Sequence, residues 1–282
     1  MWANFHTHCD YCDGKGPMQD YVDKAKQLGM LSLGFSSHAP VPFDTKWCMK
    51  AERLDEYSET ISALKQANTG LDIYAGLEVD FIPNVTSPDR FKKAVDYTIG
   101  SVHFVDKHPD GRWWEIDGLH ASFIDGLKAI FNNNIQAAIV RYFELTREMI
   151  ITACPTVVGH LDKIKIQNVD GKFFSESESW YQHEIKKTVD LISSTGSIVE
   201  VNTRGIYQRK SDTTYPSPWI LSYLHKKNVP ITISSDAHHP KDLILQFSET
   251  AMMLQNIGFK TLSVLSEGRW KPLSFDEHGI TR

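Results

Sequence analysis

The chain has 282 residues, of which 41% are hydrophobic and 23% are charged, a balance that argues against wholesale disorder and allows a sizeable core. A formal net charge of −5, with no run of Lys or Arg, disfavours long nucleic acids as partners. The chain has neither a stretch of roughly 18 to 20 apolar residues nor the pattern of a signal peptide, so we expect no membrane partner and a cytoplasmic location.

Short apolar runs typical of strands alternate with segments of helical periodicity along the chain. The expected strands cover residues 2–5, 31–35, 71–79, 97–104, 156–158, 197–201 and 229–233. The expected helices or helical hairpins cover residues 18–28, 50–66, 88–95, 120–154, 178–193, 217–226 and 241–257.

This alternation of strand and helix, about seven times over, predicts an α/β fold with a parallel sheet and crossover helices. Near-continuous apolar strands such as Ile231-Thr232-Ile233 fit a sheet that is covered on both faces. An open doubly wound sheet is the alternative, but seven units in a chain of this length suit a closed or nearly closed barrel better. With no linker rich in Pro, Gly or Ser, we expect a single domain over residues 1–282, with an insertion around residues 105–135 beside the barrel mouth.

Metal-ligand residue types stand at the carboxyl end of nearly every predicted strand. In a β/α barrel those ends converge on one face, so residues far apart in the sequence can meet. Alternate residues of a strand project to the same side, which predicts that both members of an H-x-H or D-x-H pair point inward. The clusters are His6-x-His8, Ser37-His38, Glu78-Val79-Asp80, Ser101-Val102-His103, Gly159-His160-Leu161-Asp162 and Asp236-Ala237-His238.

These clusters supply about nine candidate donors, more than one ion would use, so two or three divalent ions are indicated. The set combines imidazole and carboxylate without an obligatory thiolate, which suits zinc, manganese or iron at a site that keeps a position open for water. The candidates are His6, His8, Asp13, His38, Glu78, His103, His160, Asp236 and His238.

The motifs, in their order along the chain, resemble those of the polymerase and histidinol phosphatase (PHP) family, and within it the stand-alone histidinol-phosphate phosphatases. The resemblance runs from the first strand to about residue 240. The motifs are His6-Thr7-His8, Asp13-Gly14, Ser37-His38-Ala39-Pro40, Gly76-Leu77-Glu78-Val79-Asp80, Gly100-Ser101-Val102-His103-Phe104, Gly159-His160-Leu161-Asp162, Glu200-Val201-Asn202-Thr203-Arg204-Gly205 and Ser234-Ser235-Asp236-Ala237-His238.

The resemblance implies a distorted, TIM-like (β/α)7 barrel with a trinuclear metal centre. One ion would be held by His6, His8, Glu78 and Asp236, a second by Asp13, His38 and His238, and a third by Glu78, His103 and His160. Glu78 would bridge ions, and Asp10 is a chemically equal rival of Asp13.

The resemblance also implies hydrolysis of L-histidinol phosphate to L-histidinol and phosphate by a metal-activated hydroxide. Arg204 is placed to donate two hydrogen bonds to the phosphate, and the alkoxide leaving group would take a proton from metal-bound water, Asp162 or His238. Asp236 completes the candidate catalytic set. The ammonium and imidazole of this substrate call for carboxylates and an aromatic wall, so the further candidates for substrate binding are Ser101, Phe43, Trp113, Glu115, Asp117 and Tyr207.

Three other interpretations are separable from this one. A related phosphoesterase or nuclease would act on other phosphomonoesters or on nucleic-acid phosphodiesters, although the acidic charge argues against strand binding. A binding module would hold the ions without turnover. An amidohydrolase barrel, which also begins with H-x-H, would need an inward lysine, for which Lys163 is the nearest candidate.

Overall fold

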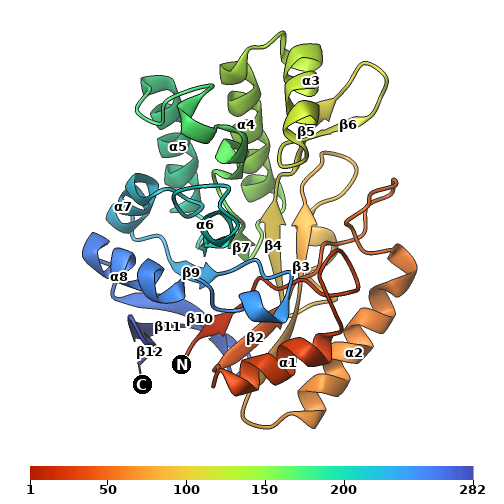
Figure 1. Cartoon of the computed structure of the whole chain (residues 1–282), viewed down its shortest axis with the longest axis vertical. Coiled ribbons are helices and arrows are strands. Elements are labelled where there is room, and N and C mark those ends of the chain that lie inside the picture. Colours follow the sequence, from red (N-terminus) through yellow and green to blue (C-terminus); the bar gives the residue numbers. More distant parts are fainter. Residues whose placement is uncertain (282) are drawn as a thin grey trace.

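Seven parallel strands wrap into the barrel seen in the computed structural model, which describes residues 1–281 (Figure 1). Their spatial order follows the chain, and each pairs in parallel with the next. The strands are β1 Ala3–Asn4, β2 Ser32–Phe35, β3 Asp72–Asp80, β4 Tyr97–Ser101, β7 Val157–Val158, β8 Ile198–Asn202 and β9 Ile231–Ser234. Nearly every strand residue is buried, as expected for a sheet covered on both faces.

The barrel closes where β1 meets β9, just beyond the end of each strand. Thr7 and Ala237 form a parallel bridge, with the His8 amide donating to the Ala237 carbonyl at 2.8 Å and the Ala237 amide donating to the His6 carbonyl at 3.1 Å. Closure is therefore confined to the mouth, and the predicted distorted (β/α)7 barrel in a single domain is confirmed.

Helices surround the strands on the outside (Figure 1). The α-helices are α1 Met18–Gln27, α2 Leu54–Ala67, α3 His120–Phe131, α4 Ile135–Thr152, α5 Ser179–Ile192, α6 Arg204–Tyr207, α7 Pro218–Lys226 and α8 Phe247–Ile257. Short 3-10 helices are η1 Ala51–Arg53, η2 Pro88–Arg90, η3 Lys163–Gln167, η4 Val169–Gly171 and η5 Pro240–Asp242. Within residues 1–281, no helix combines the length and apolar character that crossing a lipid bilayer requires.

The segment predicted as an insertion forms a hairpin and a helix. The strand expected at residues 97–104 ends at Ser101, and β5 Phe104–Lys107 turns away to pair antiparallel with β6 Trp113–Glu115. The helical hairpin expected over residues 120–154 is α3 and α4, which separate where Asn132 adopts a left-handed conformation. The helix expected at residues 88–95 is wrong, because only the single turn of η2 forms there.

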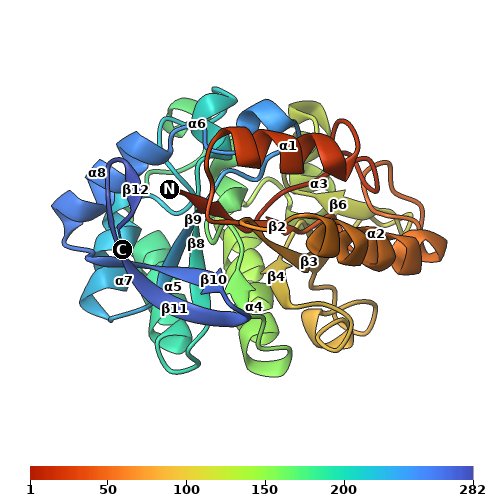
Figure 2. The same cartoon turned by 90° about the horizontal axis from the view of Figure 1, so that it is seen from below.

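A small antiparallel sheet at the end of the chain, which the strand pattern did not predict, closes the bottom of the barrel (Figure 2). Its strands are β10 Thr261–Ser266, β11 Arg269–Asp276 and β12 Gly279–Ile280. The Trp270 ring packs against the rings of Phe5 and Tyr97, with centroids 4.9 and 6.0 Å apart. The Tyr97 side chain is buried against Gly34 and Gly76 of the neighbouring strands, and its hydroxyl donates to the Phe5 carbonyl at 2.6 Å.

Candidate metal centre

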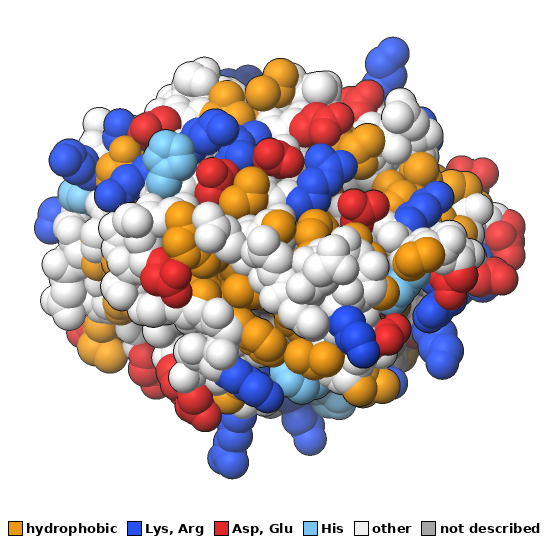
Figure 3. Space-filling model, turned by 90° about the horizontal axis from the view of Figure 1, so that it is seen from above, with side chains coloured by type: hydrophobic (Ala, Val, Ile, Leu, Met, Phe, Trp, Pro, Cys, Tyr) orange, Lys and Arg blue, Asp and Glu red, His pale blue; other side chains and the backbone are white. Residues whose placement is uncertain are grey.

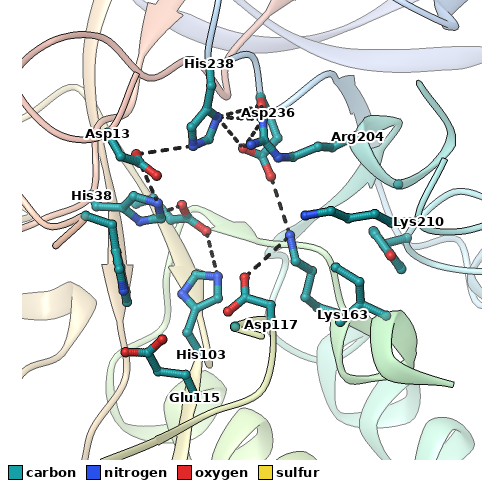
Figure 4. Close-up of a pocket in the computed structure, with 16 residues that line it drawn as sticks. Asp13, His38, His103, Glu115, Asp117, Lys163, Arg204, Lys210, Asp236 and His238 are labelled. Atoms are coloured by element: carbon teal, nitrogen blue, oxygen red, sulfur yellow. Dashed lines mark hydrogen bonds and ion pairs between the residues drawn. The ribbon is translucent and has the colours of Figure 1, made fainter. Parts of the chain in front are cut away.

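The nine side chains predicted as metal ligands converge at the carboxyl ends of the strands, and every barrel strand except β8 contributes at least one. Figure 4 shows how several of them face a common space. They are His6 and His8 after β1, Asp13 in the turn before α1, His38 after β2, Glu78 in β3, His103 after β4, His160 after β7, and Asp236 and His238 after β9.

Glu78 lies at the centre of the cluster. Its Oε2 is 3.1 Å from His6 Nε2 and 3.0 Å from His38 Nδ1, whereas its Oε1 is 2.9 Å from His160 Nε2 and 3.6 Å from His103 Nε2. The two oxygens thus face different sets of imidazoles. This geometry suits a carboxylate that bridges two ions.

Donor atoms gather into three overlapping groups, each within 4.8 Å: His8 with Asp13, His38 and His238; His6 with His8 and Asp236; and His38 with Glu78 and His103. Compared with the implied ligand sets, His8 and His38 are each shared by two groups, Glu78 falls in the third group alone, and His160 falls in none. His160 lies beside the third group, because its Nε2 is 3.2 Å from His103 Nε2.

Several of these donor atoms lie close to one another but make no hydrogen bond of acceptable geometry within the described part of the chain. They include the buried atoms His6 Nε2, His8 Nε2, His38 Nδ1 and Asp13 Oδ1. Buried polar atoms are rarely left unpaired, and imidazole and carboxylate donors converging in this way fit divalent cations. The residues present therefore fit the ions that the sequence indicated.

The carboxylates of the cluster are held in the charged form. Burial would raise the pKa of Glu78, but the imidazoles of His6, His38 and His103 hold it well below its usual range. Burial likewise opposes the charge of Asp236, whose pKa His6 and Arg204 keep well below normal. The cluster can therefore offer anionic ligands at neutral pH.

Asp13 rather than Asp10 belongs to the cluster by geometry. Asp13 Oδ1 lies 3.2 Å from His238 Nε2 and 3.8 Å from His38 Nε2. Asp10 is exposed and belongs to none of the three donor groups.

Two carboxylates behind the histidines were not among the predicted site residues. Glu200 in β8 accepts from His6 Nδ1 at 2.5 Å and from the His160 amide at 2.7 Å. Asp80 in β3 accepts from His103 Nδ1 at 3.0 Å. Such partners fix a ring so that its other nitrogen faces the metal. The alternation rule could have found Asp80, because it stands two residues after Glu78 on the same strand face.

A cavity of about 220 Å³ opens beside the cluster. Of the predicted substrate-binding residues, Arg204, Glu115 and Asp117 line it. Arg204 Nη1 donates to the Asp236 carbonyl at 2.7 Å and lies 2.7 Å from His238 Nδ1, which places the guanidinium against the ligand cluster. Residues that line the cavity and were not predicted as substrate contacts include Trp47, Lys163, Lys210 and Tyr215.

The other predicted substrate contacts do not line the cavity. Phe43 and Trp113 pack on each other and on Phe104, with ring centroids 5.4 to 6.2 Å apart. Ser101 donates to Glu78 Oε1 at 2.7 Å, and Tyr207 donates to the Ser235 carbonyl at 2.8 Å beside Arg204. Ser101 and Tyr207 therefore contact the cluster or its neighbours from outside the cavity, whereas Phe43 and Trp113 belong to a separate aromatic group.

Asp162 is a correction to the candidate catalytic set. Its carboxylate is fully buried, accepts from the Ser217 amide at 3.1 Å and pairs with Lys165 Nζ at 2.8 Å. The strand β7 ends at Val158, so the alternation that would place residue 162 beside His160 no longer applies. Asp162 therefore does not line the cavity.

Comparison with known proteins agrees with this fold. Residues 4–204 match the family model described as PHP domain. The chain is 27% identical over 271 residues to a protein of Deinococcus radiodurans named "Probable histidinol-phosphatase", covering 92% of this chain and 94% of that one. It is 26% identical over 261 residues to the histidinol-phosphatase of Bacillus subtilis, covering 84% and 94%.

Among solved structures, the histidinol phosphate phosphatase of Lactococcus lactis, complexed with zinc, L-histidinol and phosphate, aligns with a TM-score of 0.68 and 18% identity, covering 100% of this chain and 99% of that one. That likeness establishes the shared barrel. Because the family model spans most of the chain, and its match includes the HxH pair and Glu78 at the centre of the cluster, the protein belongs to the PHP domain family.

Proposed function

We propose that this chain hydrolyses L-histidinol phosphate to L-histidinol and phosphate, using two or three divalent ions of zinc, manganese or iron. The observation that carries the proposal is the set of three overlapping donor groups around Glu78, which borders a cavity lined by both cationic and acidic side chains. The names of the relatives support the choice of substrate. The cytoplasmic location stays a prediction.

The ligand roles follow the donor groups. His6, His8, Glu78 and Asp236 would hold one ion, Asp13, His38 and His238 a second, and Glu78, His103 and His160 a third. Bound ions supply positive charge for the phosphate and lower the pKa of a coordinated water toward 7. Glu200 would fix the orientation of the His6 ring at the first ion, and Asp80 would fix that of the His103 ring at the third.

Arg204 would bind the phosphate. Its guanidinium borders the cavity, and although burial opposes its charge, the carboxylate of Asp236 raises its pKa, so it stays cationic. A planar fork of donors suits phosphate oxygens. With Asp162 outside the cavity and His238 assigned to the second ion, neither of the two side chains predicted as proton donors is free to supply the proton.

The opposite wall would receive the ammonium and imidazole of the substrate. Glu115 lines this wall together with Trp47, whose ring lies edge-on to His38 at a centroid distance of 4.5 Å, and Asp117 lies between this wall and Lys163. Asp117 supplies a negative charge here, since burial opposes it but His103 and Lys163 lower its pKa. Trp47 thus takes the place that sequence reasoning gave to Trp113.

Phosphodiester cleavage in nucleic acids has less support. On the face shown in Figure 3, Lys and Arg side chains are interspersed with Asp and Glu, so this face offers no continuous basic track for a strand.

An assay of the metal-reconstituted protein against histidinol phosphate, generic phosphomonoesters and single-stranded DNA tests the proposal. His38→Ala should abolish turnover of every ester, because His38 contacts both Glu78 and Asp13. Arg204→Ala should mainly raise KM for the phosphate ester. His278→Ala, at a histidine whose side chain is 83% exposed, is the matched control and should behave as wild type. Faster cleavage of DNA than of histidinol phosphate would overturn the proposal.

A further inference from the structure

Lys163 is a buried lysine whose amino group faces the cavity (Figure 4). It begins η3, three residues after His160, and is only 5% exposed. The nearest carboxylate oxygens are Asp236 Oδ2 at 3.8 Å and Asp117 Oδ2 at 3.9 Å, both beyond hydrogen-bonding distance. The amine thus sits between two acids without a hydrogen bond to either.

Lys165, two residues further along η3, is an internal comparison. It is 8% exposed, and its Nζ lies 2.8 Å from Asp162 Oδ2 and donates to Thr213 Oγ1 and the Thr214 carbonyl, each at 3.1 Å. Lys165 is therefore fully engaged by the fold. Lys163 is equally buried, but among the described residues its Nζ has no such acceptor and lies only near the face of the Tyr215 ring, 5.6 Å from the centroid. A buried ammonium is costly unless its donors are satisfied.

The surroundings of Lys163 indicate which group would satisfy it. Arg204 and Lys210 line the same cavity, so three cations border it. They are close enough to interact, since burial lowers the pKa of Lys210 and the charges of Lys163 and Arg204 lower it further. A cluster of cations facing an open space attracts a multiply charged anion such as phosphate.

We propose that Lys163 Nζ binds a phosphate oxygen of the substrate beside Arg204 and so fixes which end of the cavity receives the phosphate. The ammonium end of the substrate is then directed toward Glu115 and Trp47 on the other wall. This inference rests on the proposed phosphatase function. It adds a residue that the family motifs quoted above do not contain.

Binding of inorganic phosphate to the metal-loaded protein, measured by calorimetry, tests this role without requiring turnover. Lys163→Met keeps most of the length of the unbranched side chain and removes its charge. Loss of one charge-assisted hydrogen bond should weaken phosphate binding roughly ten- to hundredfold. The KM values for histidinol phosphate and for p-nitrophenyl phosphate should rise together, because the two esters share only the phosphate.

Three further variants make the test decisive. Lys163→Arg should recover most of the phosphate affinity, and Lys187→Met, at an exposed lysine of α5, should not change it. Lys163→Gln is a second neutral variant should the Met variant fail to fold. Metal content is measured in each, because Lys163 also lies near Asp236.

Unchanged phosphate affinity in metal-saturated, folded Lys163→Met or Lys163→Gln would overturn the inference, leaving Lys163 as a counter-charge to Asp117 and Asp236. Wild-type protein that binds no inorganic phosphate would overturn it as well. Wild-type protein that binds phosphate through Lys163 but hydrolyses no monoester would instead refute the proposed function alone.

Discussion

At the scale of single residues, the histidines of the cluster depend on the acids behind them. Glu200 is fully buried and accepts from the ring of His6 and the amide of His160, and Ser234 donates to it as well. One carboxylate thereby orients donors from β1 and β7 together. Burial opposes the charge on Glu200, but His6 lowers its pKa, so the acceptor is anionic.

Glu200→Gln should weaken metal binding roughly 10- to 100-fold, the usual cost of losing such a partner. The amide keeps the shape of the side chain but no longer offers two anionic oxygens to His6 Nδ1 and the His160 amide. Competition against a fluorescent chelator measures the affinity. Glu144→Gln, at an exposed position of α4, is the matched control, and equal affinities of the two variants would contradict the role given to Glu200.

At the scale of elements, alternation along a strand predicted that both the first histidine pair and the last acid–histidine pair point inward, but the backbone of the last pair departs from a strand. The Nε2 atoms of His6 and His8 both approach Asp236 Oδ1, at 3.8 and 3.3 Å. Strands β1 and β9 both end two residues before their pairs, at Asn4 and Ser234, but Asp236 alone of these ligands has a positive φ, of 51°. Asp236 and His238 therefore reach the cluster through a turn, which a strand pattern cannot describe.

Much of the barrel and of the ligand cluster could be predicted because strand ends and ligand types are local properties of the sequence. The orientation of Asp162 and Lys163 could not, since η3 sets it after the strand has ended. Likewise, the sheet β10–β12 escaped prediction because its longest strand, β11, is largely exposed or half-buried and lacks an apolar run.

Gly34→Ala in β2 should destabilise the barrel by about 1 to 3 kcal/mol, the usual cost of overpacking. A Cβ atom there would lie 2.2 Å from the Tyr97 hydroxyl oxygen and 2.9 Å from Tyr97 Cζ. Urea denaturation gives the free energy of unfolding. In a double-mutant cycle, Gly34→Ala should cost less in a Tyr97→Phe background, because the closest obstacle is gone. An identical cost in both backgrounds would mean that Tyr97 is not the obstacle.

At the scale of the whole molecule, the donors come from both halves of the chain and meet only in the folded barrel. His6 and His238 lie in the same cluster, together with the buried acids Glu78 and Asp236. Ions that bind this arrangement and not the unfolded chain must stabilise the fold by mass action. Removing them leaves buried acids whose charge is balanced by protons on three of the histidines, His6, His38 and His103, whereas burial lowers the pKa values of His8 and His160.

The protons on these histidines make the affinity for metal depend on pH. Burial opposes a charge on His103, but Asp80, Asp117 and Glu78 outweigh it and raise its pKa to about 10. The pKa values of His6 and His38 are raised as well, against the effect of burial, by their acidic neighbours. Metal must displace these protons, so its apparent affinity falls as the pH falls.

The stability of the metal-free protein, by contrast, should fall as the pH rises. A histidine whose folded pKa is raised stabilises the fold fully below its unfolded pKa near 6.5, and this contribution is lost as the pH rises toward the folded value. Metal-free protein should therefore lose part of this stabilisation between pH 6 and pH 8. Over the same range, metal ions compete with fewer protons for the histidines as the pH rises. Both effects make the stabilisation by added metal larger at pH 8 than at pH 6.

Thermal unfolding of chelator-treated protein, with and without a fixed free concentration of zinc, measures this difference. We expect zinc to raise Tm at both pH values, with the larger increase at pH 8. The His38→Ala variant should show a smaller increase at each pH, because it removes a donor shared by two of the three groups. An increase that is equal at the two pH values would mean that the histidines carry no proton in the metal-free cluster, and no increase at all would mean that the converging donors do not bind zinc.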